Sequence, residues 1–188
     1  MSLTESRPNV LIAMTGSVAV LGMPQHLLAL QQLQWRFNVA MSAAAEQFLR
    51  PYAVEVLLGQ RVFTCHFETR DGVRVPHKEL TRGIDALLVM PATANILAKA
   101  AHGICDDLIS TCIVACTAPV VFVPSMNETM WLSKVVQRNV GTLRALGHHV
   151  IEPGMGYAVA DRRVALGAIP PLKELMAQLR ALSILRPA

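Results

Sequence analysis

Several common signatures of function are missing from this 188-residue chain. The fingerprint G-x-G-x-x-G does not follow the first apolar segment, where only Gly16 and Gly22 occur, and the Walker sequence G-x-x-x-x-G-K-[ST] is also missing. NAD(P) and ATP are therefore disfavoured as cofactors. Aromatic residues make up only 5%, and the bases behind the net charge of +4 are scattered rather than gathered in a stripe. This distribution argues against nucleic acid as a partner.

Cysteine and charge are also scarce. The four cysteines contain no C-x-x-C pair, and Cys105, Cys112 and Cys116 fall in one apolar segment. This pattern favours reduced, buried thiols in a cytoplasmic protein over disulfides or a metal site. Charged residues make up 16% and hydrophobic residues 53%, against about 25% and about 45–50% in average soluble domains. Such an apolar excess is typical of burial between subunits, so we expect a homo-oligomer.

Apolar segments of strand type alternate with helical patterns along the chain, and no linker rich in proline, glycine or serine divides it. The apolar run 10–23 is interrupted by polar residues and follows a segment of balanced charge, so it predicts a strand, loop and helix rather than a membrane or signal segment. Continuously apolar strands between helices predict a single α/β domain over 1–188, Rossmann-like or flavodoxin-like, with a doubly wound parallel sheet. The expected strands are 9–16, 37–42, 85–91, 118–127 and 148–154, and the expected helices are 19–33, 43–58, 95–116, 128–147 and 170–185.

Four polar loops follow the expected strands: "MTGSVA", "MSAAAEQF", "MPATAN" and "PSMNETMW". The carboxyl ends of parallel strands meet at one edge of an open sheet, so these loops should lie together. Each brings hydroxyl, amide or backbone donors to a helix start, which favours an anion and hence a phosphorylated cofactor. Taken alone, each of these polar residues is better explained as an ordinary helix cap, but four such loops together favour the cofactor site. The residues are Thr15, Ser17, Ser42, Thr93 and Asn95.

Three segments resemble one family, the flavin-dependent cysteine decarboxylases: "MTGSVA", "PATANILAKAAHGICDDLIS" and "PSMNETMW". The last matches the PxMNxxMW motif at every fixed position, and "PATAN" is similar to the PASANT motif. The resemblance covers roughly residues 8–160. It implies bound FMN, with FAD as the less favoured alternative, and a homo-oligomer built from trimers, either a trimer or a dodecamer. It also implies oxidation of a cysteine coupled to loss of its carboxylate.

The resemblance also assigns roles to individual residues. His77 would be the catalytic base, since an imidazole titrates near neutrality and can take a thiol proton. Asn127 would be catalytic too, holding the substrate carboxylate or the flavin through its amide. Without the resemblance, His77 is a histidine in a surface turn, and methionines 126 and 130 are adaptable core filler. The implied cofactor contacts are Gly16, Ser17, Ser42, Phe48, Pro91, Ala92, Thr93, Asn95, Cys105, Asp106 and Met126, and the implied substrate contacts are Asn127, Met130, Tyr157 and Arg162.

Two branches of this family differ beyond the octet "PSMNETMW". Phosphopantothenoylcysteine decarboxylases, which this chain resembles in "GICDDL" and the octet, reduce their product with a cysteine in an "ACG"-like stretch. This chain has no cysteine after Cys116. The difference favours the peptidyl-cysteine branch, whose members tailor ribosomal peptides that end in an aminovinyl-cysteine ring. The expected partner is a precursor peptide with a C-terminal cysteine, converted to an enethiol.

Segment 153–170, "PGMGYAVADRRVALGAIP", is expected to be a flexible flap over the peptide, with a solvated surface hairpin as the alternative. Three other functions stay open. One is phosphopantothenoylcysteine decarboxylation in coenzyme A biosynthesis. Another is flavin prenyl transfer, which shares the fold but whose signatures are not seen. The last is a non-catalytic, flavin-binding regulatory protein, against which the presence of both His77 and Asn127 argues.

Overall fold

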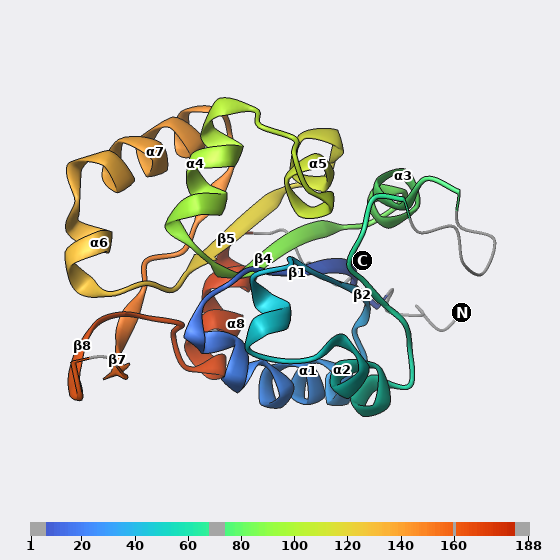
Figure 1. Ribbon diagram of the computed structural model, residues 1–188, viewed down its shortest axis with the longest axis horizontal. Coiled ribbons are helices and arrows are strands. Elements are labelled where there is room, and N and C mark those ends of the chain that lie inside the picture. Colours follow the sequence, from blue (N-terminus) through green and yellow to red (C-terminus); the bar gives the residue numbers. More distant parts are fainter. Residues whose placement is uncertain (1–6, 68–73, 160, 183–188) are drawn as a thin grey trace.

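The computed structural model describes residues 7–67, 74–159 and 161–182. Its centre is a parallel sheet of six strands in the order β3-β2-β1-β4-β5-β6 (Figure 1). This order reverses direction between β1 and β4, as in a doubly wound Rossmann-type sheet, and confirms the predicted α/β fold. The strands are β1 (Asn9–Met14), β2 (Arg36–Met41), β3 (Val62–Phe63), β4 (Ala86–Ala92), β5 (Val120–Pro124) and β6 (His149–Val150).

Helices cover both faces of the sheet (Figure 1), with α1, α2 and α8 on one face and α4, α5 and α7 on the other. Strand β1 shows why such strands are continuously apolar. Its residues 10, 12 and 14 pack in one core and 11 and 13 in the other, because successive side chains point to opposite faces. The helices are α1 (Met23–Gln32), α2 (Pro51–Leu58), α3 (Pro76–Thr81), α4 (Ala94–His102), α5 (Leu108–Ala115), α6 (Glu128–Leu132), α7 (Lys134–Ala145) and α8 (Leu172–Ala181), with 3-10 turns η1 (Val18–Gly22) and η2 (Ala45–Gln47).

Two predicted helices are each broken into two. The prediction of one helix over 95–116 is wrong, because α4 ends at Gly103, whose φ of 67° is left-handed, and α5 starts anew at Asp107. Asp107 Oδ1 accepts the Ser110 N–H at 2.8 Å, and Ser110 Oγ accepts the Asp107 N–H at 3.0 Å. Such a capping box begins a helix and a left-handed glycine ends one. The helix predicted over 128–147 is also wrong, since Ser133 is extended between α6 and α7.

Outside the sheet, β7 (Gly154–Ala158) and β8 (Arg163–Ala168) form an antiparallel hairpin. Its position is set by contacts with the octet loop. Met126 N–H donates to Gly167 O at 3.1 Å, and Arg163 Nη2 lies 3.1 Å from Glu128 Oε2. The segment predicted as a flap is therefore a hairpin attached to the loop after β5.

All four cysteines are unpaired, but they are not all buried as the sequence predicted. Cys112 is buried, whereas Cys65 and Cys105 are exposed. Burial raises the pKa of Cys112 to about 12, so this thiol stays protonated at neutral pH. Within the described ranges there is no cluster of three or more histidine, cysteine or acidic residues suited to a metal ion. Nor is any described helix long and apolar enough to cross a membrane.

Candidate cofactor and substrate site

A cavity of about 590 Å³ lies at the carboxyl ends of β1, β2, β4 and β5. All four predicted loops contribute to its lining, together with the start of α5. It therefore lies at the edge where open α/β sheets bind their ligands. Of the cofactor contacts implied by the sequence, the cavity is lined by Gly16, Ser17, Ser42, Thr93, Asn95 and Met126.

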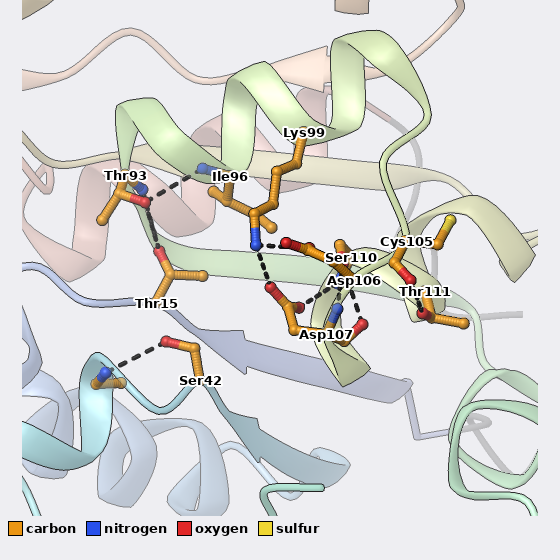
Figure 2. A network of polar contacts seen from close by, with 11 residues as sticks. Thr15, Ser42, Thr93, Ile96, Lys99, Cys105, Asp106, Asp107, Ser110 and Thr111 are labelled. Carbon is orange, nitrogen blue, oxygen red and sulfur yellow. Dashed lines mark hydrogen bonds and ion pairs between the residues drawn. The ribbon is translucent and has the colours of Figure 1, made fainter. Parts of the chain in front are cut away.

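The loops after β1 and β4 are joined by Thr15 and Thr93 (Figure 2). Thr15 Oγ1 donates to Pro91 O at 2.7 Å and accepts the Thr93 N–H at 3.0 Å. Thr93 Oγ1 in turn accepts the Ile96 N–H at 3.3 Å and so caps α4. The single hydroxyl proton of Thr15 is donated to Pro91 O, so the role of Thr15 is to link the two loops. Thr93 caps α4, whose amino terminus lies at the cavity.

The loops after β1 and β2 approach each other closely. A Cβ on Gly16 would lie 2.4 Å from the Cβ of Ala44, a separation that real side chains do not adopt. Ser42 Oγ accepts the Ala45 N–H at 3.2 Å (Figure 2), which leaves the Ser42 hydroxyl proton available. Ser17 Oγ donates to Ser125 Oγ at 3.1 Å, which leaves the Ser125 proton available in the same way.

These donors fit the phosphate of a flavin mononucleotide. Two hydroxyl protons and the amino terminus of α4 face one cavity, and such a combination favours an anion. The rest of the wall includes apolar side chains, among them Ala43, Ile96, Ile109 and Met130. A planar aromatic ring system is bound by surfaces of this kind, with few polar groups to orient it.

A charged cluster borders the cavity, with Lys99 and Asp107 in its wall. Lys99 Nζ lies 2.6 Å from Asp106 Oδ1 and 2.6 Å from Asp107 Oδ2 (Figure 2). Burial alone would lower the pKa of Lys99, but the two bonded carboxylates outweigh it and raise the pKa. Burial likewise acts to raise the pKa of Asp107, yet the bonds from Lys99 and Ser110 hold it below its ordinary value. All three groups are therefore charged at neutral pH, and the cluster carries one net negative charge.

A second cavity of about 410 Å³ lies between η1 and the β7–β8 hairpin. It shares Ser17, Ser125 and Met126 with the first cavity, so the two adjoin. Asn127 and Tyr157, two of the substrate contacts predicted from the sequence, line it. Asn127 Oδ1 caps α6 by accepting the Met130 N–H at 2.8 Å, and its two N–H donors remain available for a ligand.

Other predicted contacts do not line either cavity. Phe48 and Cys105 are exposed, and Asp106 is bonded to Lys99 beside the first cavity. Arg162 lies at the hairpin turn with a φ of 50°. Their roles in binding stay predictions, as do those of Pro91 and Ala92, which are buried at the end of β4.

His77 lies apart from the other predicted catalytic residue. It is the second residue of α3, a helix where the sequence predicted a polar turn, and it lines neither cavity. Figure 1 shows α3 beside α5, at the opposite end of the molecule from α6 and the hairpin. Asn127 lies directly before α6. A single chain therefore does not bring His77 and Asn127 together.

The sequence motifs and this geometry agree with the comparison to known families. The family model described as "Flavoprotein" matches residues 2–183. The chain belongs to the flavoprotein family. It is 34% identical over 172 residues to mersacidin decarboxylase of a Bacillus species, a match that covers 89% of this chain and 87% of that protein. It is also 34% identical over 149 residues to the coenzyme A biosynthesis bifunctional protein CoaBC of Bacillus subtilis, covering 79% of this chain but 37% of the bifunctional protein.

Solved structures of other flavoproteins share the whole fold. The FMN-dependent cysteine decarboxylase SpaF superposes with a TM-score of 0.80 at 29% identity, covering 97% of this chain and 99% of SpaF. A PPC decarboxylase variant complexed with pantothenoylaminoethenethiol superposes with a TM-score of 0.81 at 27% identity, covering 95% of this chain and 99% of that one. The family resemblance inferred from the motifs is thus confirmed, and both branches considered in the sequence analysis are represented among the relatives.

The sequence analysis did not single out several residues of the cavity wall, among them Ile96, Lys99, Asp107, Ile109 and Ser125. A signal for two of them was present in the sequence. Lys99 follows Asn95 by four residues, which puts both on one face of a helix. The pattern D-x-x-S from Asp107 to Ser110, directly before an apolar run, is a helix start.

Proposed function

We propose that this flavoprotein is an FMN-dependent oxidative decarboxylase acting on the C-terminal cysteine of a peptide. The observation that carries the proposal is the pair of adjoining cavities, one with phosphate donors and one beneath a hairpin. The similarity to mersacidin decarboxylase and to SpaF supports it. Two exposed residues of the hairpin segment, Tyr157 and Val159, line the second cavity, so a peptide bound there can extend into solvent. When bound, FMN supplies the oxidation by accepting an electron pair and a proton from the cysteine side chain.

In this proposal the chain itself binds and orients both groups. The hydroxyls of Ser42 and Ser125 and the amino terminus of α4 hold the phosphate. The free N–H donors of Asn127 hold the substrate carboxylate. Burial in the largely apolar second cavity disfavours the charged carboxylate and so favours its loss as neutral CO2.

The role of His77 requires a second copy of the chain. A base must come within about 2.6–3.2 Å of the proton it removes, and His77 lines neither cavity of its own chain. We therefore propose that His77 of one chain serves the cavities of another. A surface for this assembly is available beside the loop after β2, where three exposed apolar side chains follow at intervals of four residues. They are Phe48, Tyr52 and Val56, exposed by 42%, 74% and 66%.

The assembly is expected to be a trimer or a larger oligomer of trimers. Burial of exposed apolar side chains favours association, and a heterologous interface whose rotation is a third of a turn closes into a ring of three. Multi-angle light scattering at micromolar concentration should give a mass that is a multiple of three chains. A stable monomer under these conditions would mean that no second chain brings His77 to the cavities, and would contradict its proposed role.

The product distinguishes the proposed reaction from the alternative. The holoprotein should convert a peptide ending in cysteine to a product lighter by CO2 and two hydrogens, with oxygen consumed as the flavin is reoxidised. The same peptide ending in serine is the control and should remain unchanged. Mass spectrometry and an oxygen electrode measure both results. Loss of CO2 alone, without net oxidation, would overturn the proposal.

A second candidate is phosphopantothenoylcysteine decarboxylation, favoured by the similarity to CoaBC and to the PPC decarboxylase structure. Reduction of an enethiol needs a proton donor at the carbon, and this chain has no cysteine after residue 116 to provide one. Tyr157 is the residue in the second cavity able to replace it. Turnover of phosphopantothenoylcysteine to a product that has lost CO2 alone would favour this candidate.

A further inference from the structure

Lys99 is a cation in a cavity that fits an anionic cofactor, yet its charge is already matched by two carboxylates. Both bonds measure 2.6 Å, and the Lys99 side chain is only 16% exposed. A phosphate at Lys99 would approach a cluster with one net negative charge. Although Lys99 lines the same cavity, this charge balance argues against it as a ligand of the phosphate.

The position of Lys99 in the fold indicates a different role. It belongs to the last turn of α4, while Asp107 is the cap of α5. Its ammonium group thus spans the joint between the two helices, 103–107. Each helix contributes to the cavity wall on its own side of the joint, α4 with Asn95 and α5 with Ile109.

The two carboxylate oxygens of Asp107 connect α5 to Lys99 of α4. Asp107 Oδ1 caps α5 and Asp107 Oδ2 binds Lys99, so the start of α5 is tied to α4 through a single carboxylate. Figure 2 shows Lys99 extending from α4 toward Asp106 and Asp107. Without the ammonium group, two neighbouring carboxylates would repel each other at the joint.

We propose that Lys99 is a positioning residue, which holds α4 and α5 at the angle that shapes the cavity for the flavin without contacting the phosphate. The proposal rests on the proposed function only in that FMN binds in this cavity. It predicts that loss of Lys99 weakens the binding of the whole flavin, irrespective of its phosphate.

The test compares FMN with riboflavin, which lacks the phosphate, by fluorescence titration of the apoprotein. Lys99→Met keeps the length of the side chain and removes the charge, and should weaken both ligands by about tenfold, the order expected for losing a charge-assisted hydrogen bond. The ratio of the two dissociation constants should stay that of the unmodified protein. Lys99→Arg, which can bond both carboxylates, should restore both affinities.

Two further variants calibrate this experiment. Ser42→Ala removes a predicted phosphate donor and should weaken FMN but not riboflavin. Lys173→Met removes an exposed lysine of α8 and should change neither affinity. Where Lys99→Met does not fold, Asp107→Asn replaces it, because asparagine keeps the cap and loses the charge that binds Lys99. This variant too should weaken both ligands alike.

Three results would overturn the proposal. Selective loss of FMN affinity in Lys99→Met would make Lys99 a phosphate ligand. Unchanged affinity for both ligands would leave Lys99 without a role, and failure of Lys99→Arg to restore binding would indicate direct contact with the ring system. If the unmodified protein binds neither FMN nor riboflavin, the proposed function fails. If the unmodified protein binds them and only the variants depart from expectation, the role proposed for Lys99 fails alone.

Discussion

His77→Asn is expected to lose decarboxylation by about 10²–10⁴-fold, the usual contribution of a positioned acid–base group. The variant should remain folded and bind FMN, because the substitution leaves unchanged the groups proposed to hold the phosphate, which are Ser42, Ser125 and the amino terminus of α4. Mass spectrometry of the peptide product measures the loss, and the flavin absorbance measures the loading. Turnover near that of the unmodified protein, in a folded and yellow variant, would remove His77 from catalysis.

Mixed oligomers test whether His77 acts on another chain. Asn127→Asp is the complementary variant, since aspartate still caps α6 but repels the substrate carboxylate. Each variant alone should be inactive. Co-expressed in equal amounts, the two should recover activity, because about a quarter of the sites in a randomly mixed ring combine an intact Asn127 with an intact His77 of the neighbouring chain. No recovery in verified mixed oligomers would mean that both residues serve from one chain.

Gly167→Ala is expected to abolish peptide turnover while FMN binding is retained. The new Cβ would lie 1.9 Å from Met126 O, and the φ of 123° at this position is one that residues with a side chain rarely adopt. To avoid this clash, the β7–β8 hairpin must move away from the loop that carries Met126 and Asn127. A displacement of about 1 Å at a reacting group can cost about 10²-fold in rate. Steady-state kinetics with the cysteine-ended peptide measure the effect.

The matched control for this variant is Gly141→Ala. Gly141 lies in the interior of α7, where an added Cβ meets nothing within 4 Å. Alanine is the better helix former, so this change should leave turnover unaffected and stabilise the protein by about 0.5–1 kcal/mol. Equal losses of turnover in both variants would contradict the specific role of Gly167.

The cavity was predictable because its position follows from strand order. Parallel strands that are continuously apolar end at one edge, and the polar loops after β1, β2, β4 and β5 meet there. The charged cluster was missed for a local reason. The apolar pattern over 95–116 predicts one helix, whereas Gly103 ends α4 and the capping box at Asp107 begins α5.

The place of His77 and the docking of the hairpin were not predictable in the same way. Helix α3 has only six residues, and its position depends on packing against α5 rather than on its own pattern. The hairpin sequence shows turn residues and alternating small side chains but gives no sign of the partner that it contacts. The close approach of Gly167 to Met126 is a tertiary feature that appears only when both segments are placed.

The bond from the Met126 amide to Gly167 O has a consequence for protein engineering. Exchange of the hairpin alone, to alter which peptides are accepted, would place a foreign strand against an unmatched loop. Segments 124–128 and 153–170 are therefore one cassette and should be transplanted together. Libraries that vary both segments at once, with a glycine kept at position 167, would sample substrate range without separating the hairpin from the loop that carries Asn127.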